Sequence, residues 1–125
     1  MGIRLLVVAL GGAVGCSLRY LSTLGATRIF GTEFPAGTLL VNVVGCLLAG
    51  ILFGIAEERA GFPPIVSLLL MTGFLGGFTT FSSFSLETVN LVRDGTWVVA
   101  LFSLAANNVI GISCALGGIY LGRAV

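Results

Sequence analysis

Histidine and lysine are absent from this chain of 125 residues, and charged residues of any kind make up only 9% of it. Soluble domains usually carry charge on about a quarter of their residues. The net charge is +1, which offers no basic surface for a nucleic acid. Without histidine, lysine or a nucleophile beside a visible base, an enzyme is the weakest interpretation of the sequence.

Cysteine is also scarce. Cys16, Cys46 and Cys114 are an odd number of residues, lie far apart and form no C-x-x-C pattern. These spacings exclude a zinc or haem site of any usual kind. We interpret the three thiols as small packing residues within apolar segments.

What the chain has in abundance is apolar sequence. Hydrophobic residues make up 57% of it, and the mean hydropathy is +1.13. Since a membrane-spanning helix takes roughly 20 residues, four spans nearly use up the chain. The sequence predicts an all-α integral membrane protein with one domain, residues 1–125. It is multi-pass, lies in the lipid of the inner or plasma membrane, and has no cleavable signal peptide. The spans are expected at residues 3–24, 36–56, 65–92 and 96–121.

The third span is unusual in its middle. Residues 73–85 contain three glycines, and after them five hydroxyl side chains that are interspersed with Phe81 and Phe84. Glycine lets a backbone leave the helix, and non-helical backbone in a bilayer is tolerated only where protein or water covers it. The alternative is a helix-packing seam, because Gly, Ser and Thr are frequent at membrane helix interfaces. Composition alone leaves both interpretations open.

The length of the third span favours a break. About 28 residues of continuous helix would extend about 42 Å, which exceeds the roughly 30 Å hydrocarbon core. A break between Gly73 and Thr80 would absorb the excess and give two half-helices.

Isolated polar residues mark the other spans. Asn42 and Thr38 are four residues apart, so they share one face of the second span. Asn42 forms either an interhelical hydrogen bond or part of a polar pathway. Arg19, expected about one turn from the end of the first span, either reaches the interface or lies at a vestibule. The adjacent Asn107 and Asn108 point about 100° apart, so at least one should face protein.

The arginines are evenly divided between the two sides of the membrane. Three fall on the side of the termini and three on the other, namely Arg4, Arg59 and Arg123 against Arg19, Arg28 and Arg93. Orientation follows the Lys/Arg bias between loops, and here there is none. The sequence therefore predicts insertion in both orientations and pairing of two antiparallel copies. The alternative is that one arginine fixes a single orientation.

The polar residues suit an anion better than a cation. All five acidic residues lie near predicted span ends or in loops, whereas a cation pathway wants carboxylates inside the membrane. The Asn42 amide, the hydroxyls near Thr80 and a half-helix N-terminus supply donors. Phe81 and Phe84 share a helix face, and the electropositive edges of their rings suit weak anion contact. Ordinary packing is the alternative for this pair.

Three motifs together resemble the Fluc (CrcB-type) fluoride channels. The segment Gly76-Gly77-Phe78-Thr79-Thr80-Phe81-Ser82-Ser83-Phe84-Ser85-x-Glu87 is similar to that family's third-helix signature. Gly12-x-x-Gly15-x-x-x-Arg19-Tyr20 and Gly37-Thr38-x-x-x-Asn42-x-x-Gly45 are similar to its first- and second-helix motifs. The resemblance covers the whole chain, and the third-helix motif is the most specific.

The resemblance implies a passive, fluoride-selective channel that exports fluoride from the cytoplasm. It implies a dual-topology homodimer with two antiparallel pores. The pathway residues expected on this basis are Asn42, Phe81, Phe84, Thr80, Ser82 and Ser83, together with Thr38 and, on the fourth span, Ser113. Arg19 and Glu87 are expected at a vestibule or in structural roles.

The resemblance also implies a structural Na⁺ at the centre of the dimer. Its ligands are expected to be the backbone carbonyls of Gly76 and Thr79, one set from each chain, because a hard cation prefers oxygen.

Two other functions fit a small four-span protein. One is a proton-coupled exporter of cationic solutes, which would need a buried glutamate in the first span, where there is none. The other is a membrane assembly subunit that transports nothing.

Overall fold

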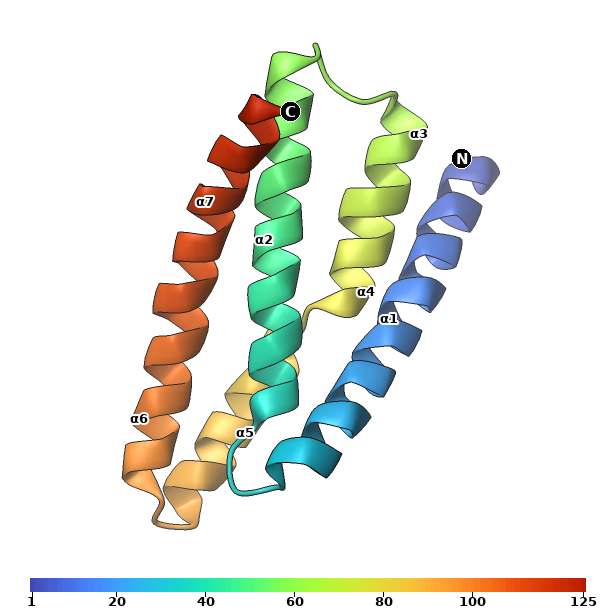
Figure 1. Cartoon of the computed structure of the whole chain (residues 1–125). Coiled ribbons are helices and arrows are strands. Elements are labelled where there is room, and N and C mark those ends of the chain that lie inside the picture. The colour runs from blue at the N-terminus through green and yellow to red at the C-terminus, as the bar shows by residue number, and fades with distance from the viewer.

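The computed structural model describes all 125 residues and consists of helices joined by short connections (Figure 1). Both termini lie at the same end of the molecule. In chain order the elements are α1 (Gly2–Phe30), α2 (Ala36–Glu58), α3 (Pro64–Ser67), η1 (Leu68–Leu75), α4 (Gly76–Phe78), α5 (Phe81–Arg93), α6 (Trp97–Ala105), η2 (Ala106–Ile110) and α7 (Gly111–Ala124).

These elements form four segments long and apolar enough to cross a membrane: Gly2–Phe30, Ala36–Glu58, Pro64–Arg93 and Trp97–Ala124. Only 20 of the 125 residues are buried within the chain, and large apolar side chains are exposed along every span. So much exposed apolar surface requires lipid or another subunit as cover. The chain is a multi-pass membrane protein, as the sequence predicts.

The first span is longer than expected. The helix continues through Arg28 to Phe30, and Gly31, with φ 78°, ends it. Positive φ is readily available only to glycine, so Gly31 can end the helix at little cost. The predicted end near residue 24 is therefore wrong. Arg19 lies about three turns before the end of α1 rather than one.

Glycines hold α1 against the first half of the third span. A side chain on Gly11 would meet backbone atoms of Leu69 and Phe74, and one on Gly15 would meet those of Phe74 and Phe78. The approach is reciprocal, since Gly73 and Gly77 lie equally close to α1. Gly11 and Gly15 thus form a small-x-x-x-small contact of the kind that is frequent between membrane helices.

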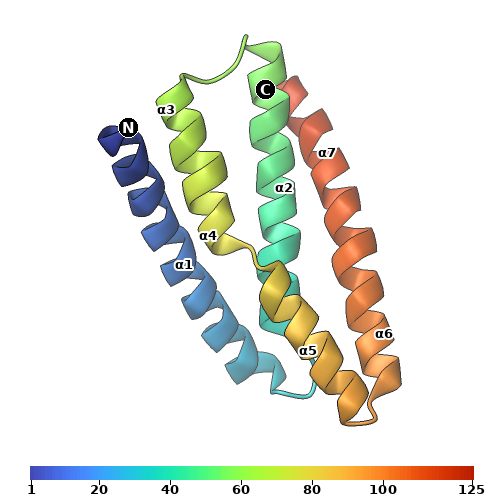
Figure 2. The same ribbon diagram turned by 180° about the vertical axis from the view of Figure 1, so that it is seen from behind.

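A second seam of the same kind joins α2 to α7. Gly50 and Gly54 lie against the backbone of Ala115 and Ile119, while Gly118 and Gly122 lie against α2. Helices that approach to backbone contact are closely packed, and Figure 2 shows α2 and α7 running side by side.

The third span leaves the helical conformation at Thr79 and Thr80, which we call the interruption. Thr79 has φ −85° and ψ 160°, and Thr80 has φ −153° and ψ 115°, both extended. The expectation that the glycines release the backbone is wrong. Gly73 lies in the π-helical η1, and Gly76 and Gly77 lie in the helix α4. Gly73 and Gly77 pack on α1.

The span also changes neighbours at this point. Before the interruption, α3, η1 and α4 lie beside α1; after it, α5 runs toward α6 (Figures 1 and 2).

Candidate functional site

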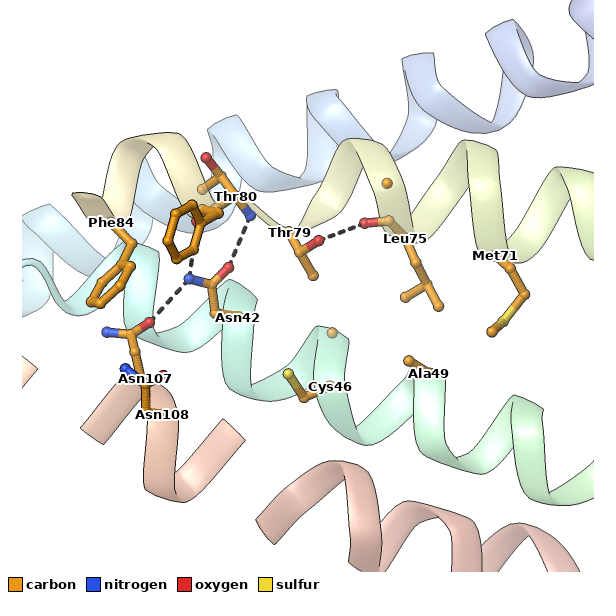
Figure 3. A pocket seen from close by; sticks show the side chains of 13 residues that line it. Asn42, Cys46, Ala49, Met71, Leu75, Thr79, Thr80, Phe84, Asn107 and Asn108 are labelled. Atoms are coloured by element: carbon orange, nitrogen blue, oxygen red, sulfur yellow. Dashed lines mark hydrogen bonds between the residues drawn. The ribbon is translucent and has the colours of Figure 1, made fainter. Parts of the chain in front are cut away.

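Asn42 of α2 bridges the interruption. Its Oδ1 accepts the backbone N–H of Thr80 at 2.9 Å, and its Nδ2 donates to the Thr80 carbonyl at 3.1 Å (Figure 3). One side-chain amide thus satisfies both backbone groups of a residue that has left the helix. Unsatisfied backbone groups are costly at membrane depth, so this bridge is what permits the extended conformation there.

The second N–H of Asn42 is also engaged. It donates to Oδ1 of Asn107 at 3.0 Å, and Asn107 Nδ2 donates to the Ser103 carbonyl at 2.9 Å. The predicted interhelical hydrogen bond of Asn42 is therefore confirmed. Both amide hydrogens of Asn42 have protein acceptors, so its role as a donor to an anion stays a prediction that requires one of them to be released.

Hydroxyl groups gather where α5 begins. Thr80 is the N-cap of α5, and its Oγ1 accepts the N–H of Ser83 at 3.1 Å. The same oxygen lies 3.1 Å from the Ser83 hydroxyl and 3.3 Å from that of Ser82. Thr79 instead donates its hydroxyl to the Leu75 carbonyl at 2.9 Å. The hydroxyls of Thr80, Ser82 and Ser83, which we predicted along the pathway, thus form a compact cluster around one capping residue.

A cavity of about 460 Å³ opens beside the interruption. Its walls come from α2, the third span and η2, namely Asn42, Gly45, Cys46, Ala49, Met71, Leu75, Gly76, Thr79, Thr80, Phe81, Phe84, Asn107 and Asn108 (Figure 3). The rings of Phe81 and Phe84 lie 5.7 Å apart at 56°. Phe84 is buried, whereas Phe81 is 78% exposed. The cavity thus combines amides, hydroxyls and two aromatic rings on one surface.

Thr38 and Glu87 form a separate group further along α2 and α5. The Thr38 hydroxyl donates to Glu87 Oε1 at 2.8 Å, and Oε2 is buried without a partner. Both residues line a second cavity of about 290 Å³, which also includes Asn90 and Asp94. Of the predicted pathway and vestibule residues, one cavity is therefore lined by Asn42, Thr80, Phe81 and Phe84, and the other by Thr38 and Glu87.

Ser82 and Ser83 belong to the hydroxyl cluster at Thr80 but line neither cavity. Two further predicted residues lie apart from both the cavities and the cluster. Ser113 of α7 is exposed and lines neither of them. Arg19 is half-buried, makes no salt bridge, and donates to Cys16 Sγ at 3.7 Å. The structure does not bring either residue together with the others.

Sequence reasoning missed Asn107 and Cys46 as cavity residues. Asn107 and Asn108 both line the cavity because they lie in the π-helical η2, whose wider turn alters the angle between neighbouring side chains. Two amides in mid-span were the available signal for Asn107. Nothing in the sequence separates Cys46 from the other thiols.

Two carbonyls at the interruption lose their usual helical donors. The Thr80 N–H, which would reach the Gly76 carbonyl in a continuous helix, donates to Asn42. The Ser83 N–H, which would reach the Thr79 carbonyl, donates to Thr80 Oγ1. A side chain on Gly76 would meet nothing within 4 Å, so this face is open. Carbonyl oxygens that have lost their usual helical donors, on an open face, fit a hard cation such as Na⁺.

The fold and the cavity define a class of protein: a small multi-pass helical membrane protein whose polar cavity is built around an interrupted helix. The arrangement offers donors, acceptors and ring edges to a small polar solute, and no side chain in the cavity is paired as a nucleophile and its base.

Residues 6–119 match the family model described as CrcB-like protein, Camphor Resistance (CrcB). The chain is 43% identical over 122 residues to a protein of Maridesulfovibrio salexigens, covering 98% of this chain and 97% of that one. It is 43% identical to a protein of Agrobacterium fabrum, covering 97% of each, and 41% identical to one of Chloroflexus aurantiacus, covering 96% and 95%. All three relatives are named fluoride-specific ion channel FluC.

The chain belongs to the CrcB family, which the resemblance of its three motifs predicts. The relatives carry the name of an ion channel, which is a class of transporter and not of enzyme.

Proposed function

We propose that this protein is a passive, fluoride-selective channel through which fluoride leaves the cytoplasm. The observation that carries the proposal is the cavity beside the interruption, where amides, hydroxyls and two aromatic rings meet at membrane depth. An ion that sheds its water must find hydrogen-bond donors inside the protein, and this surface supplies them without any fixed positive charge. Weak contacts also allow the ion to leave again.

The anion path follows α5. Thr80, Ser82 and Ser83 offer hydroxyls at its start, and Phe81 and Phe84 present ring edges beside them. Asn42 contributes one N–H when that hydrogen leaves one of its two acceptors, the Thr80 carbonyl or Asn107 Oδ1.

The second cavity extends the path toward the membrane surface. Thr38 lies one turn from Asn42 on α2, and Glu87 lies one turn from Phe84 on α5. The Thr38 hydroxyl is bonded to Glu87, so Thr38 offers its donor to the ion only when that bond opens. We assign Glu87 to the vestibule, where its carboxylate holds Thr38.

Two antiparallel copies complete the channel. In one protomer Phe81 is 78% exposed, although it borders the cavity. A second copy would cover this ring and close the cavity, which explains why an aromatic path residue is left open. The even division of arginines allows the two copies to insert in opposite orientations. A C-terminal tag should therefore be accessible to protease from both faces of the membrane.

A structural Na⁺ belongs at the centre of this dimer. The Gly76 and Thr79 carbonyls of each copy would hold it, because both have lost their usual donors and lie at the interruption. The ion would supply fixed positive charge that stabilises converging carbonyl dipoles, and it takes no part in carrying the anion.

The proposal is tested by ion efflux from liposomes that contain the purified protein. Vesicles loaded with fluoride and chloride salts are diluted into ion-free buffer with a potassium ionophore, and two ion-selective electrodes follow release. Fluoride should leave rapidly and chloride at the rate of protein-free vesicles. Equal rates for the two anions, or no fluoride release from folded protein, would refute it.

A further inference from the structure

A chain of side-chain amides runs from the interruption to the fourth span, and both of its ends rest on backbone groups. At one end Asn42 Oδ1 accepts the Thr80 N–H, which can only donate. At the other end Asn107 Nδ2 donates to the Ser103 carbonyl, which can only accept. Between them, Asn42 Nδ2 donates to Asn107 Oδ1 at 3.0 Å.

These fixed ends determine the orientation of both amides. A flipped Asn42 would place its NH₂ group against the Thr80 N–H and its oxygen against a carbonyl. A flipped Asn107 would place its NH₂ group against that of Asn42 and its oxygen against the Ser103 carbonyl. Each amide therefore has one satisfactory orientation, and the orientation of Asn42 depends on Asn107 as well as on Thr80.

Asn108 provides the contrast. It is adjacent in sequence, lies in the same π-helical segment and borders the same cavity. Its Nδ2 donates at 2.8 Å to the Leu104 carbonyl of its own helix, and it makes no bond to Asn42. Asn107 is half-buried and Asn108 exposed. Only one of the two neighbouring amides connects the fourth span to the interruption.

We propose that Asn107 is a positioning residue that holds the Asn42 amide across the interruption and so sets the shape of the anion path. Asn107 acts through Asn42. Its Oδ1 accepts a hydrogen bond from one amide N–H of Asn42, while the other N–H donates to the Thr80 carbonyl. Without that acceptor, one N–H of the half-buried Asn42 has no protein partner, and its side chain is free to turn from Thr80. The role in the anion path rests on the proposed function, whereas the hydrogen bonds between Asn107, Asn42 and Thr80 do not.

A double-mutant cycle in the fluoride efflux assay tests this dependence. Asn107→Leu removes the acceptor while keeping the same branched shape and number of side-chain heavy atoms, and we expect efflux to fall about tenfold, the effect of losing one hydrogen bond. In an Asn42→Ala background the same change should have no further effect. The control Asn108→Leu should change efflux by the same factor in both backgrounds. Independent, multiplying effects of Asn107→Leu and Asn42→Ala would overturn the proposal.

A second readout does not depend on fluoride. The side-chain ¹H–¹⁵N signals of Asn42 are assigned by their absence from Asn42→Ala, and exchange of their hydrogens with water is measured. Both should be protected in the wild type, and one should exchange faster in Asn107→Leu. Asn107→Asp, which keeps an acceptor oxygen in either protonation state, should preserve protection. Unchanged exchange in Asn107→Leu would overturn the inference.

The efflux and exchange measurements distinguish a failure of the proposed function from a failure of the role that we infer for Asn107. If the wild type conducts no fluoride, the proposed function fails while the exchange measurement still decides the role of Asn107. If the wild type conducts and Asn42 exchange is independent of Asn107, only this inference fails. Should Asn107→Leu yield no folded protein, Asn107→Ala removes the same acceptor without the bulk of leucine and replaces it in both experiments, with the same expected and contradicting results.

Discussion

The two halves of the third span are stabilised in different ways. Before the interruption, η1 and α4 lie against α1 through backbone contacts at Gly73 and Gly77, where no side chain fits. After it, α5 is held by side-chain hydrogen bonds, from Asn42 to Thr80 and from Thr38 to Glu87. The first half is fixed by shape and the second by polar partners.

This difference suggests that the first half of the third span anchors the structure and that the second half contains the anion path. A close-packed helix interface has essentially one arrangement, so it holds the first half of the third span in place. Hydrogen bonds between side chains can be exchanged for bonds to a passing ion at little net cost. The residues that we assign to the anion path therefore lie in the second half, and the first half provides the fixed end from which the interruption is built.

The largest effect is expected in the anchored half. In Gly15→Ala the new methyl group meets the backbone of Phe74 and Phe78, so we expect a loss of about 1–3 kcal/mol in stability and little folded protein. Gly25→Ala, where a side chain meets nothing within 4 Å, should instead stabilise the helix by up to about 1 kcal/mol. Thermal unfolding in detergent measures both, and equal stability of the two variants would contradict the seam.

The junction between the halves is expected to depend on sodium. Replacing Na⁺ with a bulky organic cation on both sides of the vesicle should slow or abolish fluoride efflux, because the carbonyls of Gly76 and Thr79 would then lack the cation that we propose for them. Returning Na⁺ should restore the rate. Efflux that is unchanged after exhaustive exchange of Na⁺ would remove the ion from the account.

The aromatic rings test the polar half directly. Phe81→Ile and Phe84→Ile remove the ring edges but keep apolar bulk, and each should lower fluoride efflux about tenfold, which corresponds to about 1.4 kcal/mol. Phe53→Ile, on α2 and outside both cavities, should leave efflux unchanged. Unaltered efflux in both test variants would take these rings out of the pathway and leave ordinary packing as their role.

A smaller effect is expected from the capping hydroxyl. Thr80→Val removes the N-cap of α5 and the centre of the hydroxyl cluster, a loss of about 1 kcal/mol that should lower efflux about fivefold. Thr88→Val removes a hydroxyl that bonds only the Phe84 carbonyl of its own helix. If Thr88→Val lowers efflux as much as Thr80→Val, the position of the hydroxyl is irrelevant and the cluster has no special role.

The sequence alone predicted four spans, a polar third span and Asn42 as a residue with an interhelical partner, since each leaves a local signal in hydropathy or residue type. It misplaced the end of α1, because Gly31 and not the polar Arg28 ends the helix. It assigned the glycines to the break, whereas Gly73 and Gly77 pack on α1 and the threonines leave the helix.

These errors have one cause. Whether a glycine opens a helix or allows another helix to approach depends on which neighbour lies against it, and a single sequence does not contain that information. The same holds for Asn107, whose partner lies 65 residues away in the chain. The π-helical turn that places it beside Asn42 has no distinctive residue pattern.

The most direct test of the whole account is fluoride efflux through Asn42→Ala, measured together with the oligomeric state of the same preparation. Losing the bridge leaves both backbone groups of Thr80 without partners and should distort the path, so efflux should fall well below the wild-type rate, yet stay above that of empty vesicles, while the protein still elutes as a dimer. Wild-type efflux from a stable Asn42→Ala dimer would contradict the account, and a dimer that falls apart would make Asn42 a packing residue.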